Sequence, residues 1–113
     1  MVKAAGLGYA DRIEVLIGFN ANTEKITGLF ILDQKETPGL GNKIIHRQWR
    51  SQFVDKDTGL PLTVVKGKSS APQEIDAING ATISSKSVVN IINRTVVDVK
   101  KQLMEKAAGR RKG

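Results

Sequence analysis

The segment 76–84 combines residue types that suit the binding of a phosphate group. In order, it offers an acidic side chain, two small residues and two hydroxyl groups: Asp76, Gly80, Ala81, Thr82 and Ser84. A helix is expected to begin directly downstream, near Lys86, and a helix N-terminus presents unpaired N–H groups and about half a positive charge. A phosphate placed there is stabilised without a dedicated arginine. Capping of the helix by Ser84 or Ser85 is the commoner use of such residues, so the spacing alone leaves both roles open.

A second segment, Glu36–Gly41, has the composition of a structured loop. Its sequence Glu-Thr-Pro-Gly-Leu-Gly places Pro38 among glycines, which interrupts regular hydrogen bonding and permits positive φ angles. The loop is not a dinucleotide fingerprint, because the last glycine of G-x-G-x-x-G would fall on Ile44. Considered by itself, the segment is better explained as an ordinary Pro-Gly turn.

The elements that must position these segments begin with a hairpin. Apolar residues alternate from Ile13 to Phe19, and Ile26–Leu32 is a second β-rich run, with the polar stretch 20–25 between them. The run Leu60–Val65 predicts a third strand, and 67–74 predicts a polar loop.

Two helices are also predicted. Asn42 is placed as an N-cap, and the four-residue steps of Ile45, Trp49 and Phe53 indicate a short helix over 43–53 with Trp49 facing inward. The last third has the apolar steps of a long amphipathic helix. Its expected inward residues are Val88 or Val89, Ile92, Val96, Val99 and Leu103. Strands early and a long helix late favour an α+β fold.

Length and composition fit one small domain without its own metal chemistry. The chain has 113 residues, a net charge of +7, no cysteine and a single histidine. These counts exclude disulfides, thiolate metal sites and a multi-histidine site, so any redox chemistry requires an organic cofactor. We predict one domain over 1–108 with a basic, disordered tail over 109–113. Its sheet is expected to be curved and mainly antiparallel, with flanking helices and a long C-terminal helix.

The two segments together resemble a known family. The stretch 76–84 resembles the motif D-x-x-[S/T]-G-A-T-x-[S/T] of the FMN-binding domain found in the G subunit of Rnf electron-transport complexes and the C subunit of Na⁺-translocating NADH:quinone reductases. The stretch 36–41 resembles the second signature of that family, and the two occur in the same order. Asn79 departs from the usual Ser or Thr, at a position that is not the attachment site.

The resemblance implies an FMN joined through its phosphate to the last hydroxyl of the motif, here Ser84, with Thr82 as the competing position. A separate flavin transferase that uses FAD and a divalent metal is expected to form this phosphoester, and Asp76 is a candidate to position that metal. The resemblance places two groups of residues at the cofactor. Around the phosphate these are Gly80, Ala81, Thr82, Ile83 and Ser85, and near the flavin ring they are Glu36, Thr37, Gly39 and Leu40.

The resemblance further implies an electron carrier rather than a self-sufficient enzyme. It would relay electrons among the other subunits of a membrane redox complex, on the extracytoplasmic side of the cell membrane, through an anchor that is absent from this chain. One alternative is a domain of the same fold that binds FMN reversibly. Another is a small basic nucleic-acid-binding domain, which the charge permits. The scattered aromatic residues and the lack of an RNA-binding motif argue against it, so no nucleic-acid partner is expected.

Overall fold

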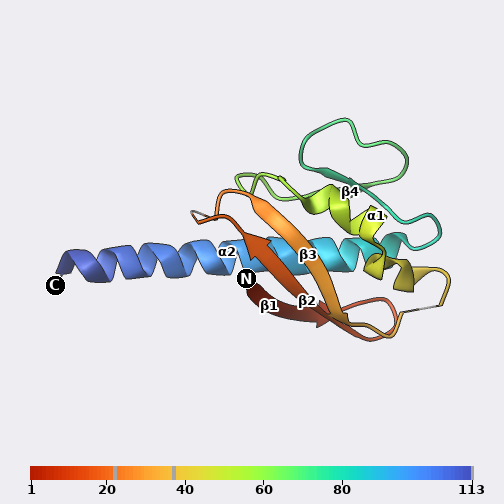
Figure 1. The fold of residues 1–113 in the computed structure, drawn as a ribbon, viewed down its shortest axis with the longest axis horizontal. Helices are drawn as coiled ribbons and strands as arrows, with labels where there is room; N and C mark the ends of the chain where they lie inside the picture. The colour runs from red at the N-terminus through yellow and green to blue at the C-terminus, as the bar shows by residue number, and fades with distance from the viewer. Residues whose placement is uncertain (22, 37, 113) are drawn as a thin grey trace.

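The computed structural model describes every residue except 22, 37 and 113, and side chains up to Glu105. A three-stranded antiparallel sheet, in the order β1-β2-β3, packs against a long C-terminal helix, with a small parallel sheet and short helices beside it (Figure 1). The elements follow one another along the chain as β1 Val2–Leu7, β2 Arg12–Phe19, β3 Ile26–Asp33, η1 Gly41–Ile45, α1 Arg47–Arg50, η2 Ser51–Phe53, β4 Thr63–Val65, β5 Glu74–Asp76 and α2 Thr82–Lys112. This arrangement confirms the predicted α+β domain.

The central hairpin is formed by β2 and β3, as the alternating pattern predicted. Register shifts at Glu14/Val15 and Gly18/Phe19 add local twist, which curves the sheet around the helix. Strand β1 was not predicted, because its sequence is rich in Ala and Gly, which are weak strand formers. It pairs with β2 over its whole length, so tertiary pairing overrides local preference here.

The predicted helix over 43–53 is wrong as a single element. The backbone of His46 is extended (φ −68°, ψ 131°), and this residue separates η1 from α1, which continues directly into η2. As a result Ile45 is 44% exposed and Ile44 is buried in its place. Trp49 and Phe53 do face inward as predicted, with their rings in edge contact at 5.2 Å between centroids.

The predicted cap at Asn42 is also wrong. Its side-chain Oδ1 accepts the Gly39 N–H at 2.9 Å instead, so the residue closes the preceding turn.

The predicted third strand is confirmed only in its second half, as β4. Pro61 lacks an N–H, and both backbone groups of Leu62 bond to the side chain of Asn93 at 2.9 Å, so the chain before Thr63 is tied to α2 rather than to a sheet. Strand β5, at the end of the predicted loop, pairs with β4 in parallel. This pairing sets the chain that follows β4 next to the chain that leads into α2.

Helix α2 crosses the inner face of the sheet and continues past it (Figure 1). Val88, Val89, Ile91 and Ile92 are buried with the inward residues of β2 and form the centre of the core. The apolar stripe predicted to reach Leu103 ends near Val96, and Leu103 is 43% exposed because the helix has left the sheet by that point. Helix α2 extends to Lys112. The disorder predicted for the tail 109–113 stays a prediction.

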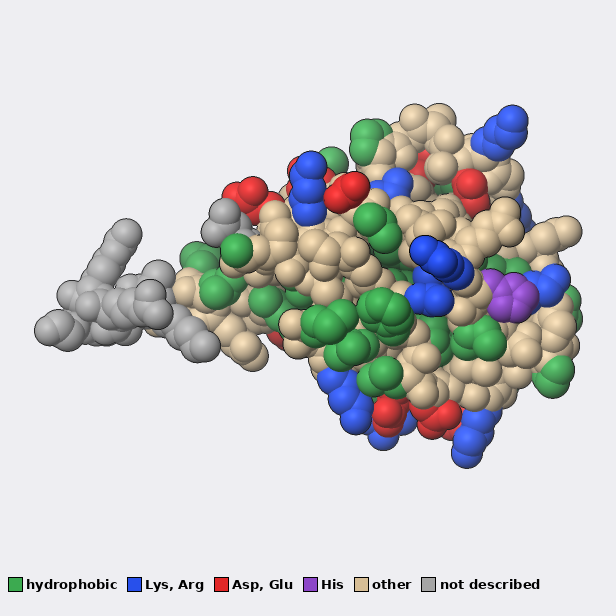
Figure 2. Space-filling model, viewed as in Figure 1, with side chains coloured by type: hydrophobic (Ala, Val, Ile, Leu, Met, Phe, Trp, Pro, Cys, Tyr) green, Lys and Arg blue, Asp and Glu red, His purple; other side chains and the backbone are tan. Residues whose placement is uncertain are grey.

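Two surface features complete the fold. Figure 2 shows hydrophobic side chains gathered over the three-stranded sheet, where Phe30 and Leu32 of β3 are about half exposed. The Arg50 guanidinium lies 5.4 Å from the centroid of the Phe30 ring.

Within the part of the chain that the structure describes, no helix is both long enough and apolar enough to cross a membrane.

Candidate functional site

The turn into α2 places the hydroxyl residues inside the helix rather than before it. Gly80 has φ +80°, a conformation that favours glycine, and it leads directly into a helix that begins at Thr82. The first helical hydrogen bond runs from the Ser85 N–H to the Ala81 carbonyl at 3.1 Å. The predicted start near Lys86 is therefore wrong, because this turn allows the helix to begin four residues earlier. The N–H groups of residues 82–84 lie before the first helical bond and have no acceptor within the helix.

The neighbouring serines have different environments. Ser84 is 3% exposed, and its hydroxyl donates a hydrogen bond to Glu36 Oε1 at 2.8 Å. The hydroxyl of Ser85 donates to the Ala81 carbonyl at 2.9 Å and accepts the Ile78 N–H at 3.0 Å, so it secures the turn from within the core. Neither serine caps the helix, and of the two only Ser84 contacts an ionisable group.

Glu36 is held in place by three donors. Its Oε1 also accepts the Tyr9 N–H, and its Oε2 accepts the Ala10 N–H, both at 2.7 Å. Burial raises the pKa of this carboxyl, but the hydrogen bonds from Ala10, Ser84 and Tyr9 together lower it by more. The net pKa therefore lies below its ordinary value. The carboxylate is 3% exposed and ionised at neutral pH.

The Glu36–Ser84 contact is enclosed by two glycines. A Cβ at Gly41 would lie 2.6 Å from Ser84 Oγ and 2.8 Å from Glu36 Cβ, and a Cβ at Gly8 would lie 2.5 Å from Glu36 Oε1. A Cβ at Gly80 would meet the side chain of Leu40 at 3.1 Å. The two sequence motifs are therefore packed directly against each other.

A pocket of about 510 Å³ opens over this contact. Its lining includes residues of both motifs and two residues from outside them: Leu40, Gly41, Gly80, Ala81, Thr82, Ile83, Ser84, Tyr9 and Lys66. This volume is within the range usual for small-molecule sites. Ser84 is buried by its neighbours but belongs to the wall of this pocket. Tyr9, Leu40 and Ile83 are 65%, 44% and 56% exposed and supply apolar surface at the rim.

Sequence reasoning missed Tyr9, Gly41 and Lys66 as pocket residues. Lys66 directly follows β4 and also lines a neighbouring pocket with Gly80 and Thr82. The parallel β4–β5 pairing brings it there, and β5 was not predicted. A signal existed only for Gly41, since it belongs to the quoted loop motif.

Four predicted site residues are not among those that line the pocket: Glu36, Gly39, Ser85 and Asp76. Thr37 falls outside the described residues. Gly39 has φ +77° with open space around it, and Ser85 is fully buried beneath the turn. Asp76 lies on β5, where its carboxylate accepts the Ser69 N–H at 2.6 Å and so holds the loop. Among the described residues, no cluster of acidic, histidine or cysteine side chains could bind a metal ion.

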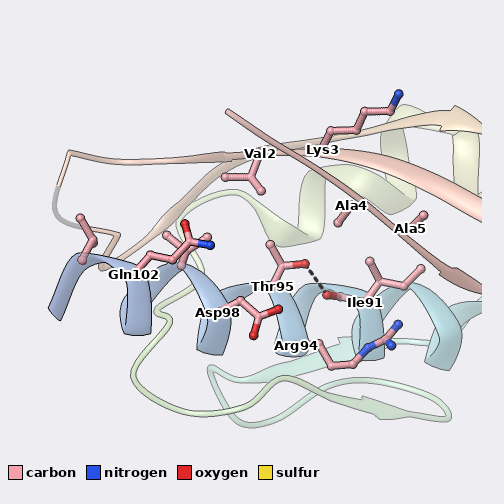
Figure 3. A pocket seen from close by; sticks show the side chains of 11 residues that line it. Val2, Lys3, Ala4, Ala5, Ile91, Arg94, Thr95, Asp98 and Gln102 are labelled. Carbon is pink, nitrogen blue, oxygen red and sulfur yellow. Dashed lines mark hydrogen bonds between the residues drawn. The ribbon is translucent and has the colours of Figure 1, made fainter. Parts of the chain in front are cut away.

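Another pocket, of about 530 Å³, lies between β1 and the middle of α2 (Figure 3). It is lined by charged and polar side chains such as Lys3, Arg94, Asp98 and Gln102, and the hydroxyl of Thr95 bonds internally to the Ile91 carbonyl. None of the predicted site residues lines this pocket. The chemistry indicated by the sequence belongs to the first pocket.

The first pocket has the features that a phosphate ester requires. Free helical N–H groups and the positive end of a long helix favour an anion, and Lys66 adds a cation to the lining of the pocket. A hydroxyl in contact with a carboxylate is the usual arrangement of an activated nucleophile. The apolar rim suits a planar aromatic group. The residues present therefore fit a phosphorylated aromatic cofactor joined through a serine oxygen.

Comparison with known proteins identifies the family of the chain. Residues 8–97 match the model of the FMN-binding domain family. The chain is 42% identical over 90 residues to the G subunit of the Na⁺-translocating ferredoxin:NAD⁺ oxidoreductase complex of Acetobacterium woodii, which covers 79% of this chain and 42% of the relative. It is 33% identical over 95 residues to the C subunit of the Na⁺-translocating NADH-quinone reductase of Yersinia pestis, which covers 78% of this chain and 36% of the relative.

Solved structures show the same fold. The C subunit of the Na⁺-translocating NADH-quinone reductase of Parabacteroides distasonis superimposes with a TM-score of 0.72 and 31% identity, over 81% of this chain and 50% of that one. The corresponding protein of Shewanella oneidensis gives 0.71 with 22% identity, over 81% and 46%. The chain thus spans about half the length of the relatives it matches, or less. Both signature segments lie inside the matched region, and the chain belongs to the FMN-binding domain family.

Proposed function

We propose that this domain carries FMN covalently, through a phosphoester to the Ser84 hydroxyl, and serves as an electron carrier. The observation that supports this most directly is the hydrogen bond of 2.8 Å from Ser84, a residue that lines the pocket, to Glu36. It joins the last hydroxyl of one family motif to the first residue of the other. When bound, the flavin supplies the redox chemistry, since no side chain of this cysteine-free chain does so.

The surroundings of the hydroxyl groups favour Ser84 over its neighbours as the attachment point. Ser85 is fully buried, and both of its hydrogen bonds are within the turn, so a phosphate there would disrupt the core. Thr82 is half-buried and also lines the pocket, so it is the competing position. Ser84 combines a place on the pocket wall with contact to an ionised carboxylate, which Thr82 lacks among the hydrogen bonds of the described residues.

The pocket residues divide into two roles toward the cofactor. The N–H groups of residues 82–84 and the Lys66 ammonium would hold the phosphate, whose remaining negative charge the helix end stabilises. Tyr9, Leu40 and Ile83 would contact the flavin ring with their apolar surfaces. Because both groups come from elements fixed by the core, the cofactor would be held in one orientation relative to the sheet.

The place of this domain in a larger assembly is part of the proposal. The relatives named above are subunits of ion-translocating oxidoreductase complexes. By analogy, this domain would exchange electrons with other subunits of such a complex, on the extracytoplasmic side of a membrane. A flavin transferase that uses FAD and a divalent metal would install the cofactor, and the Asp76 carboxylate, of which Oδ1 accepts the Ser69 N–H, is the candidate to position that metal.

The test is the intact mass of the chain after co-expression with a flavin transferase. We expect an adduct of one FMN less one water, a yellow band that persists after denaturation, and peptide mapping of the adduct to Ser84. Ser84→Ala should carry no adduct, and Ser84→Thr should retain it. Ser87→Ala is the matched control, because that hydroxyl lies on the same helix and bonds only to the Ile83 carbonyl.

Two results would change the proposal. An adduct that persists in Ser84→Ala and disappears in Thr82→Ala would move the attachment to Thr82. A wild-type chain that stays at its unmodified mass with active transferase, yet binds FMN reversibly, would refute the covalent bond and leave a reversible carrier.

A further inference from the structure

We propose that Glu36 takes the proton of the Ser84 hydroxyl when the flavin phosphoester forms, so that the domain supplies the base for its own modification. This inference rests on the proposed attachment of FMN at Ser84. It assigns to the chain, and not to the transferase, one chemical step of the reaction.

The geometry of the two groups meets the requirements of a nucleophile and its base. The donor and acceptor atoms are 2.8 Å apart, within the range for proton transfer. Glu36 is fixed from the other side by the Tyr9 and Ala10 N–H groups, so the carboxylate cannot turn away from the hydroxyl. The Ser84 hydroxyl donates its proton toward Glu36, and Ser84 also lines the pocket. An electrophile that reacts with the Ser84 oxygen would have to enter through this pocket.

The other hydroxyls of α2 show that this contact is not a general property of the helix. The hydroxyls of Ser85, Ser87 and Thr95 each donate to the carbonyl four residues earlier in the helix. A backbone carbonyl holds a hydroxyl but does not take its proton. Ser84 alone among these residues donates to a carboxylate, and that carboxylate comes from a segment 48 positions away.

The Glu36 carboxylate is also free of competing charges. Among the described residues, no Lys, Arg or His lies within 4.0 Å of it, so no ion pair neutralises its charge. Its hydrogen bonds hold its pKa below the ordinary value in spite of burial, which keeps it ionised at neutral pH. Glu36 and Ser84 are each 3% exposed, so the contact is buried.

The step balances with a flavin dinucleotide as the second substrate. Ser84 Oγ forms a bond to the phosphorus that bears the riboflavin, and the bond from this phosphorus to the bridging oxygen of the pyrophosphate breaks. The adenosine monophosphate part leaves with that oxygen, and the proton of Ser84 passes to Glu36. No electrons are exchanged in this step.

The experiment measures the rate of adduct formation in a single turnover, by intact mass, with the purified full chain and excess transferase, FAD and Mg²⁺. Glu36→Gln is the main variant, because one amide oxygen can still accept from Tyr9 and Ser84 while the charge is lost. General-base contributions are about 10²–10⁴-fold, so we expect a fall of at least about 100-fold. Glu74→Gln is the matched control, since Glu74 also accepts backbone N–H groups but lies at the first position of β5 and does not line the pocket.

A second variant separates chemistry from folding. Glu36→Ala should be slow, and added formate should restore part of the rate, because formate can occupy the vacated space and accept the proton. Circular dichroism of each variant verifies the fold. A purely structural role for Glu36 would predict lost stability without rescue by formate.

The outcomes distinguish this inference from the proposed function. A wild-type chain without an adduct would refute the attachment itself. A wild-type chain that forms the adduct, with Glu36→Gln folded and within about threefold of its rate, would leave the attachment standing and overturn the role of Glu36. Absence of formate rescue in a folded Glu36→Ala chain would also count against it.

Discussion

Gly41→Ala is the substitution that most directly tests the packing of the site. The added Cβ would lie 2.6 Å from Ser84 Oγ and 2.8 Å from Glu36 Cβ, well inside the 3.4 Å at which ordinary contact begins. The chain can respond in two ways. Either Ser84 rotates and gives up a charge-assisted hydrogen bond of about 1.5–3 kcal/mol, or the backbone shifts at an overpacking cost of about 1–3 kcal/mol. We therefore expect a loss of about 2–3 kcal/mol in the free energy of unfolding.

The assay is urea unfolding followed by the fluorescence of Trp49, the single and buried tryptophan of the chain. A loss of this size corresponds to a fall in Tm of roughly 10 °C for a domain of this length. The rate of covalent FMN incorporation should fall as well, because the added methyl group lies against the attacking oxygen. In a Ser84→Ala background the substitution should cost less, since the contact with Oγ is gone while that with Glu36 persists.

The control is Gly28→Ala on strand β3, where the added Cβ would meet nothing closer than the Phe30 ring at 3.5 Å. It should change stability by less than about 0.5 kcal/mol. If Gly41→Ala is as stable as this control and accepts FMN at the wild-type rate, Ser84 and Glu36 are not packed against Gly41 as described, and the account of the site fails.

The remaining predictions concern charge and hydrogen bonding around the same turn. Because the folded-state pKa of Glu36 is lowered, its stabilising contribution is full above the ordinary carboxyl value of 4.5 and is lost as the pH falls through the folded value. The difference in Tm between wild type and Glu36→Gln should therefore shrink on acidification, and a constant difference from about pH 3 to 7 would contradict it. Ser85→Ala should cost about 1–3 kcal/mol in urea unfolding, because it leaves the buried Ile78 N–H without its acceptor, and the folded variant should still take the adduct. Lys66→Glu should slow adduct formation about tenfold, while Lys68→Glu, outside the pocket, should not; equal rates would remove Lys66 from the site.

Elements with strong local patterns could be predicted from the sequence. Strand β2 alternates apolar and polar residues, β3 is a mainly apolar run rich in strand-forming residues, and α2 repeats its buried residues at helical spacing, so all three were identified. Strands β1 and β5 were missed because their own residues favour no strand, and pairing with β2 and β4 forms them. The break at His46 was missed because an apolar spacing of four carries no information about a single extended residue.

The site was predictable only as two motifs, not as one arrangement. Ser84 and the turn that we propose binds the phosphate follow from local residue types and from the family resemblance. Glu36 was placed near the flavin ring, but its carboxylate contacts the Ser84 hydroxyl, and only the folded chain shows this contact. Lys66 could not be found, since its position depends on a parallel pairing of two three-residue strands.

The long sequence separation between Glu36 and Ser84 has a consequence for when the cofactor can be installed. A nascent or misfolded polypeptide can display the motif around Ser84, yet it does not hold a carboxylate beside the serine oxygen. On the proposed mechanism, flavin attachment would be coupled to completion of the tertiary structure, and yellow colour would report native molecules. A cell that makes this protein would then consume flavin dinucleotide only in the modification of chains that have already folded.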